Sequence, residues 1–302
     1  MSWLAFAFSG PVLWAVSTHL DKYFVEQYFK QSDVAVLLVF TACVGVLMLP
    51  FIAFYHPDFA ALQIGSIALI MCSGILYMGA LLFYLRALQS EEASVVAPFF
   101  QAAPLFGNVL AYLVLGETLS ARQMTGGATI VAGTLIVSVR FERNVRAFKL
   151  RLAALMLACG FALALSGLIF KVFAIKVEFW TTTFWLFVGE AVFGSALLTV
   201  ASYRRQFVAV LRANTAALLT VSGANELINL GGTLGSRYAL LLAPLSIVQA
   251  IGSTTTLFVF AFGVGLSASF PRLARETLSL RELTQKAAAA LLVAVGVALV
   301  AR

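Results

Sequence analysis

The stretch Glu117-Thr118-Leu119-Ser120 occurs twice in this chain, because Glu276-Thr277-Leu278-Ser279 repeats it 159 residues later (276 − 117 = 159). Each copy is followed at the same offsets by an arginine and a threonine, which are Arg122 and Thr125 in the first copy and Arg281 and Thr284 in the second. A charged motif that recurs with its spacing intact indicates an internal repeat, and such a repeat decides the architecture of a chain.

Two further blocks recur in the same order. Near the start of each half, Ala15, Ser17, Lys22 and Phe24 correspond to Ala164, Ser166, Lys171 and Phe173, a shift of 149 (164 − 15). Later, Ser94, Val96, Leu105 and Phe106 correspond to Ser246, Val248, Leu257 and Phe258, a shift of 152 (246 − 94). Apolar helices always align to some extent, but this does not explain the recurring Glu, Arg and Lys. The sequence therefore predicts a duplicated chain.

The composition is that of a membrane protein. Of the 302 residues, 62% are hydrophobic and 11% are charged, with a mean hydropathy of +0.98, whereas soluble domains are about 25% charged. Apolar runs near spanning length begin and end at about 2–20, 34–55, 64–85, 94–116, 123–139, 152–175, 180–202, 216–242, 245–266 and 285–301. We expect an all-α membrane protein with ten transmembrane helices, because transmembrane strands alternate in polarity instead.

The repeat unit contains an odd number of spans. Five helices in residues 1–140 precede a basic connecting loop at 141–151, and five more follow in residues 152–302. The second unit therefore enters the membrane in the opposite sense, which gives two inverted five-helix repeats. In transporters of this kind the substrate site lies between the repeats, near the membrane midplane.

At these motifs the chain resembles the EamA-type repeat of the drug/metabolite transporter superfamily. The resemblance is carried by the apolar helix that ends in Gly116-Glu117-Thr118-Leu119-Ser120 and by the Ala-rich stretch Ala93–Pro104 with its two prolines. The second half departs from the pattern, since Ala274-Arg275 replaces the Gly-Glu approach. The resemblance implies alternating access, small organic solutes and a cavity walled by helices 1, 3, 4, 6, 8 and 9. Export is the commoner bacterial role in that superfamily.

The cationic residues predict an orientation. Five of the 20 lysines and arginines follow even-numbered spans, namely Arg122, Lys171, Lys176, Arg237 and Arg302, and the other 15 lie on the opposite side. By the positive-inside rule both termini are extracytoplasmic, in a multi-pass protein of the plasma (inner) membrane. The resemblance implies the opposite, because ten-helix members usually keep both termini in the cytoplasm. We follow the charges.

The eighth predicted span is the richest in polar groups. Ser222, Asn225, Asn229, Gly232 and Ser236 form one helical face, and Glu226 lies beside it. We interpret the small residues as a helix-packing seam and assign Asn225, Glu226 and Asn229 to substrate binding, since an intramembrane carboxylate is costly. Further binding candidates come from the repeat and from the resemblance: Trp14, Tyr77, Tyr84, Gln101, Asn108 and Gln249.

Other intramembrane groups receive alternative interpretations. Glu190 is either a proton-coupling carboxylate, as Glu226 is in the same hypothesis, or the buried partner of Lys171 or Lys176. Lys171 near a helix end is expected to extend to the membrane interface, and Glu117 to cap the following helix. Pro98 and Pro104 are expected to bend the fourth span and to serve as gating points.

Several classes of function do not fit the sequence. Two distant histidines and cysteines confined to apolar runs predict no metal site, no cofactor and no enzyme, and a basic excess in membrane loops does not indicate nucleic acid. We expect a monomeric or homodimeric transporter of amino-acid-like or aromatic metabolites in the lipid bilayer. A flippase for a lipid-linked sugar is the alternative, followed by a non-transporting membrane subunit.

Overall fold

The computed structural model describes residues 2–28, 33–90, 102–138, 150–213, 220, 223–269 and 280–301, and the following statements concern these residues. Their secondary structure is helical, and no strand occurs among them. The all-α prediction is therefore confirmed for this part of the chain.

The first half contributes five long helices and a short one. They are α1 (Ser2–Tyr28), α2 (Val34–Tyr55), α3 (Ile64–Ser90), α5 (Ala102–Leu115) and α6 (Ala121–Ser138), with the 3-10 turn η1 (Pro57–Ala61) between α2 and α3. Asp33 caps α2 by accepting a hydrogen bond from the Ala35 N–H at 2.9 Å, which satisfies a free donor of the first turn. At the end of α5, Gly116 adopts a φ of 65°, the left-handed conformation that ends a helix.

The second half contributes α7 (Leu150–Lys176), α8 (Phe179–Thr199), α9 (Ala201–Ala213), α11 (Gly223–Leu242), α12 (Leu245–Gly252), α13 (Thr255–Ser269) and α14 (Leu280–Ala301). The predicted ninth span is thus divided into α12 and α13. At the break, Ser253, Thr254 and Thr255 each turn a side-chain hydroxyl back to the carbonyl three residues earlier, at 2.6–2.7 Å. Such local bonds compete with the regular helix.

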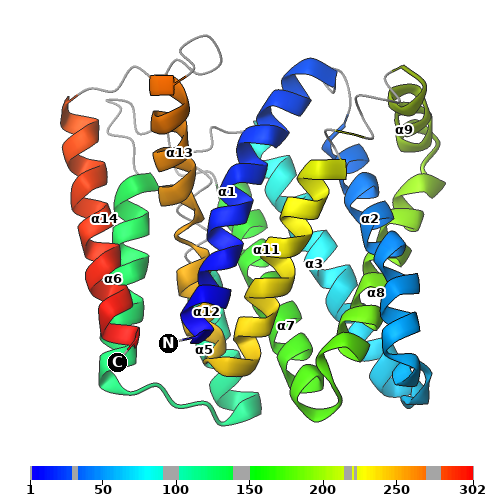
Figure 1. The fold of residues 1–302 in the computed structure, drawn as a ribbon, viewed down its shortest axis with the longest axis horizontal. Helices are drawn as coiled ribbons and strands as arrows, with labels where there is room; N and C mark the ends of the chain where they lie inside the picture. Colours follow the sequence, from blue (N-terminus) through cyan, green and yellow to red (C-terminus); the bar gives the residue numbers. More distant parts are fainter. Residues whose placement is uncertain are drawn as a thin grey trace.

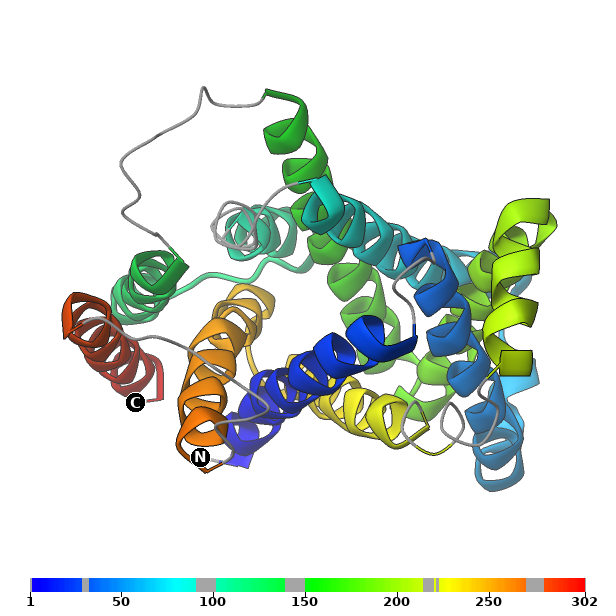
Figure 2. The same ribbon diagram turned by 90° about the horizontal axis from the view of Figure 1, so that it is seen from above.

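The helices form a bundle whose contacts join the two halves of the chain (Figure 1). α1 packs along α11, α7 packs along α3 and α5, and α2 packs along α8. α6 and α14 form a separate pair at one side, as both views show (Figure 2). Their backbones approach closely, because a Cβ on Gly126 would come within 2.8 Å of the Gly296 carbonyl oxygen.

The lengths of the helices suit a bilayer. Among the described residues, five stretches are long and apolar enough to cross a membrane, at 34–55, 64–87, 154–176, 179–199 and 245–263. The helices at 102–115 and 287–300 are apolar but shorter. Both chain ends lie at the lower end of the bundle in Figure 1.

The helix α9 was not predicted, since Arg204, Arg205 and Arg212 were assigned to a loop. It is seen nearly end-on in Figure 1 and along its length in Figure 2, so it lies across the ends of the other helices. Phe207 and Val210 pack against Phe40 and Val36 of α2, and the three arginines are exposed. A basic helix with one apolar face is typical of a membrane interface.

Candidate functional site

A polar cavity lies between α2, α3, α8 and α11. On α11, Glu226, Asn229 and Thr233 are spaced three and four residues apart and lie on one side of the helix. Glu226 and Asn229 were predicted from the sequence, whereas the rest of the predicted face, through Gly232 and Ser236, packs against α1. Tyr77 enters from α3 and Glu190 from α8. The full lining consists of Thr41, Val44, Gly45, Tyr77, Phe187, Glu190, Glu226, Asn229, Leu230 and Thr233.

Glu226 lies where α11 faces α2. The Thr41 hydroxyl donates a hydrogen bond to Glu226 Oε1 at 3.1 Å, which fixes the carboxylate at the cavity wall. Asn229 is one turn further along α11, and the aromatic rings of Tyr77 and Phe187 supply apolar surface in the same cavity. Carboxylate, amide and aromatic groups together suit a small solute that is part polar and part apolar.

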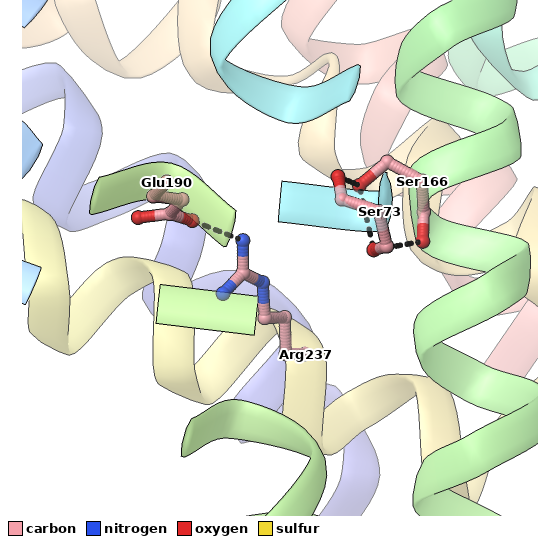
Figure 3. Close-up of polar contacts among 4 residues, drawn as sticks. All are labelled: Ser73, Ser166, Glu190 and Arg237. Atoms are coloured by element: carbon pink, nitrogen blue, oxygen red, sulfur yellow. Dashed lines mark hydrogen bonds and ion pairs between the residues drawn. The ribbon is translucent and has the colours of Figure 1, made fainter. Parts of the chain in front are cut away.

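An ion pair lies beside the cavity (Figure 3). Arg237 Nη2 of α11 donates to Glu190 Oε1 of α8 at 3.1 Å, and the two side chains are 9% and 4% exposed. The guanidinium carbon also lies over the rings of Tyr77 and Phe170, at 5.0 and 5.5 Å from their centroids. Buried cations of this kind are stabilised by pairing and by the ring faces.

This ion pair corrects two sequence predictions. The partner of Glu190 is neither Lys171 nor Lys176 but Arg237, which the sequence analysis had placed in a connection between helices. Arg237 is instead buried inside α11. The signal available in the sequence was its position one turn beyond Thr233 on the face that carries Glu226.

A second ion pair joins the two halves at the lower end of the bundle. Lys171 Nζ pairs with Glu117 Oε1 and donates to the Ala243 carbonyl oxygen at 2.7 Å. Glu117 Oε2 accepts the Leu245 N–H at 3.1 Å, so Glu117 caps α12 and not the helix that follows it in sequence. The prediction that Lys171 extends to the interface is wrong, because the residue is 4% exposed and its ammonium contacts the Glu117 carboxylate and the Ala243 carbonyl oxygen.

The contact between α3 and α8 is the tightest boundary of the cavity. A Cβ on Gly74 would lie 2.9 Å from the Glu190 backbone nitrogen and would overlap the Leu186 carbonyl oxygen, and one on Gly189 would overlap the Met71 carbonyl oxygen. Only glycine permits this approach. On the other side of α3, Ser73 and Ser166 exchange hydrogen bonds with each other's carbonyl oxygen at 3.0 and 2.9 Å, which fixes α7 (Figure 3).

The remaining predicted site residues do not line this cavity. Trp14 packs in the seam between α1 and α11, where a Cβ on Gly232 would meet its ring at 3.2 Å. Tyr84 packs with Met156 and Cys159 between α3 and α7.

The remaining predicted residues are the polar residues of α5, α11 and α12 and the two prolines. Asn108 lies on α5 and Gln249 is wedged beside Gly107 and Gly167, and neither borders the cavity, nor does the buried Asn225. Pro104 lies in α5, where it is buried. Gln101 and Pro98 fall outside the described residues.

The fold and the cavity define an integral membrane protein with a polar site between its helices. Residues 1–139 match the model of the EamA-like transporter family. The resemblance drawn from the repeated motif is thereby confirmed.

Two known proteins are similar to this chain. An uncharacterized transporter of Clostridium kluyveri is 25% identical over 152 residues, which are 50% of this chain and 47% of that protein, so the match spans about half the length of this relative. A solved crystal structure of a protein matches with a TM-score of 0.67 over 99% of this chain and 96% of that chain, at 14% identity. At that identity the likeness concerns the fold alone.

Proposed function

We propose that the protein carries small organic solutes across the plasma membrane by alternating access, with the cavity between α2, α3, α8 and α11 as the substrate site. One observation carries the proposal. In a chain whose residues 1–139 match the model of a transporter family, a carboxylate, an amide and two aromatic rings line one cavity among apolar helices. Polar groups at membrane depth are costly and usually serve a transported substrate or ion.

The proposal includes ten spans in two inverted repeats, residues 1–140 and 152–302. In this assignment α1, α2, α3, α5 and α6 correspond to α7, α8, α11, α12–α13 and α14. Two sets of contacts support it, because each has its exchanged counterpart: α1 packs on α11 as α7 packs on α3, and α1 packs on α12 and α13 as α7 packs on α5. The pairs α2–α8 and α6–α14 each exchange into themselves.

One exchanged pair of interfaces differs, and this difference supports two alternating states. The repeat shift of 152 relates Gly74 of α3 to Glu226 of α11. At Gly74 the backbones of α3 and α8 are in contact, whereas at Glu226 α11 reaches α2 through the Thr41–Glu226 side-chain hydrogen bond, beside the cavity. In the opposite state α11 closes on α2, and α3 parts from α8, which is a rocking motion of one repeat against the other.

The lining favours a solute with an amine and an apolar or aromatic part. Glu226 and Asn229 bind the amine, and Tyr77 and Phe187 contact the apolar part. Amino-acid-like or aromatic metabolites fit this description, and export is the proposed direction. Glu226 is also the proton-coupling group of the proposal, because Glu190 is already paired with Arg237. The functional unit is a monomer or a homodimer, with both termini outside the cytoplasm.

Counterflow in proteoliposomes tests the proposal. A panel of labelled amino acids, amines and aromatic metabolites is offered to the wild type, to Glu226→Gln and to Asn229→Ala. Asn108→Ala is the matched control, because it removes the same group from a helix that does not border the cavity. We expect uptake of one solute class that is lost in the two cavity variants and kept in the control.

The other outcomes are equally informative. If the control loses uptake while Asn229→Ala keeps it, the cavity is not the substrate site. If the wild type takes up no member of the panel, small-solute transport is refuted and lipid-linked substrates are tested next.

Replacing Pro104 by Ala is expected to change the transport rate and to leave substrate affinity unchanged. An unaltered transport rate counts against a gating role for Pro104.

A further inference from the structure

One nitrogen of the Arg237 guanidinium, Nη1, lacks a hydrogen-bond acceptor among the described residues. Arg237 is 7% exposed, its Nη2 donates to Glu190, and its guanidinium carbon lies over the rings of Tyr77 and Phe170. Nη1 itself is buried. Because a buried donor without an acceptor is costly, such a group in a native protein calls for an explanation.

The position of Arg237 links this donor to the cavity. Glu226, Leu230, Thr233 and Arg237 are spaced by four, three and four residues, so Arg237 continues the cavity-lining face of α11 by one turn. Its side chain leans toward the start of the helix, as helical side chains do, and therefore toward the cavity. Its contacts Glu190 and Tyr77 are themselves cavity-lining. In Figure 3 only one terminal nitrogen of Arg237 faces the Glu190 carboxylate.

We propose that Arg237 is a substrate-binding residue that holds a carboxylate of the transported solute through Nη1. This inference rests on the proposed function. The guanidinium of Arg forms strong, directed hydrogen bonds with carboxylates, and it has enough N–H donors to bind two carboxylates at once. The solute carboxylate can therefore bind Nη1 while Glu190 stays bound to Nη2. The role is a specificity determinant, because a solute without a carboxylate leaves Nη1 unpaired.

The spacing of the two charged ends sets the shape of the solute. Glu226 and Arg237 are eleven residues apart on α11, which corresponds to about 16 Å of helix rise. Both side chains lean toward the start of the helix, so their charged groups stay separated by a distance of this order. An α-amino acid carries both charges on one carbon and cannot reach both groups. The site therefore fits an elongated zwitterion, whose amine meets Glu226 and whose carboxylate meets Arg237.

Binding to the purified protein in detergent tests this assignment with defined probes. The probes are glycine, 4-aminobutanoate and 6-aminohexanoate, with butylamine and hexylamine as the matched amines that lack the carboxylate. We expect one of the two longer zwitterions to bind about tenfold or more tightly than its amine and than glycine, which is the effect of one charge-assisted hydrogen bond. Equal binding of zwitterion and amine, tightest binding of glycine, or no binding of any probe overturns the inference.

A neutral replacement of the Arg237–Glu190 ion pair tests whether Arg237 is the residue that binds the carboxylate. The double variant Arg237→Gln with Glu190→Gln leaves no unpaired buried charge, and we expect it to bind the longer zwitterion and its amine within about twofold, with amine affinity unchanged. Ser73→Ala, which removes a buried polar contact away from the cavity, should keep the wild-type preference. A preference that survives in the double variant overturns the role of Arg237. Counterflow with the wider panel remains the separate test of transport itself.

Discussion

Replacing Lys171 by Met should cost the protein a large part of its stability. The lysine side chain is 5% exposed and pairs with Glu117, which is 20% exposed, and its second contact is the Ala243 carbonyl oxygen at 2.7 Å. Lys171→Met therefore leaves a half-buried carboxylate whose remaining contact with α12 is the Leu245 N–H at 3.1 Å. Removal of one partner of a buried pair costs about 3–5 kcal/mol.

The two single variants should lose different amounts of unfolding free energy. Glu117→Gln leaves the more deeply buried ammonium without its counter-charge, so its loss belongs near about 5 kcal/mol, and that of Lys171→Met near about 3 kcal/mol. The double variant removes both charges, and replacement of a whole buried pair is often close to neutral. We expect the double variant to lose at least about 2 kcal/mol less than the sum of the single losses, because the two groups interact directly.

Equilibrium unfolding of the purified protein in mixed micelles with rising SDS measures these free energies of unfolding. Lys176→Met is the control, because Lys176 ends the same helix but is exposed, and its effect should stay within about 0.5 kcal/mol. Single effects that simply add in the double variant would refute the reasoning. An equal loss in Lys176→Met would show that α7 tolerates no change at this end for other reasons.

Three further outcomes follow from the helix contacts and the charges. Gly74→Ala should cost about 1–3 kcal/mol in the same assay, since its Cβ meets backbone of α8, whereas Gly79→Ala, whose nearest neighbour would be 3.9 Å away, should be neutral. Gly126→Ala should cost a similar amount by forcing α6 from α14, and a neutral result would mean that this pair can separate freely. A reporter fused after Arg302 should be extracytoplasmic, and a cytoplasmic signal would reverse the orientation.

The structure alters the count of charges behind that orientation. Arg237 and Lys171 were counted among the five cations on the less basic side, but both are buried in ion pairs. Three of the five cations then remain on that side, namely Arg122, Lys176 and Arg302. The basic helix α9 lies at the end of the bundle opposite the two termini. Both observations favour the proposed orientation.

Part of the cavity-lining face of α11 could be predicted, because it depends on spacing within one helix. Glu226 and Asn229 lie at the cavity as their positions in the helical repeat indicated, and the repeat shift also led to Tyr77. Trp14 was assigned to the same cavity for its aromatic ring and Gln249 for its polar amide, each on a span expected to face the cavity. Both side chains instead pack between other helices. The rotation of one helix against its neighbours is not encoded in the pattern of that helix alone.

By itself the sequence determined that this is a helical membrane protein and that Glu226 and Asn229 lie close together on the eighth predicted span. These properties follow from composition and from periodicity, which act within a single segment. Only the tertiary structure decided that Glu190 pairs with Arg237, that Lys171 pairs with Glu117, and that α3 contacts α8 backbone to backbone at Gly74. Each joins helices far apart in sequence, where the choice of partner depends on packing in three dimensions.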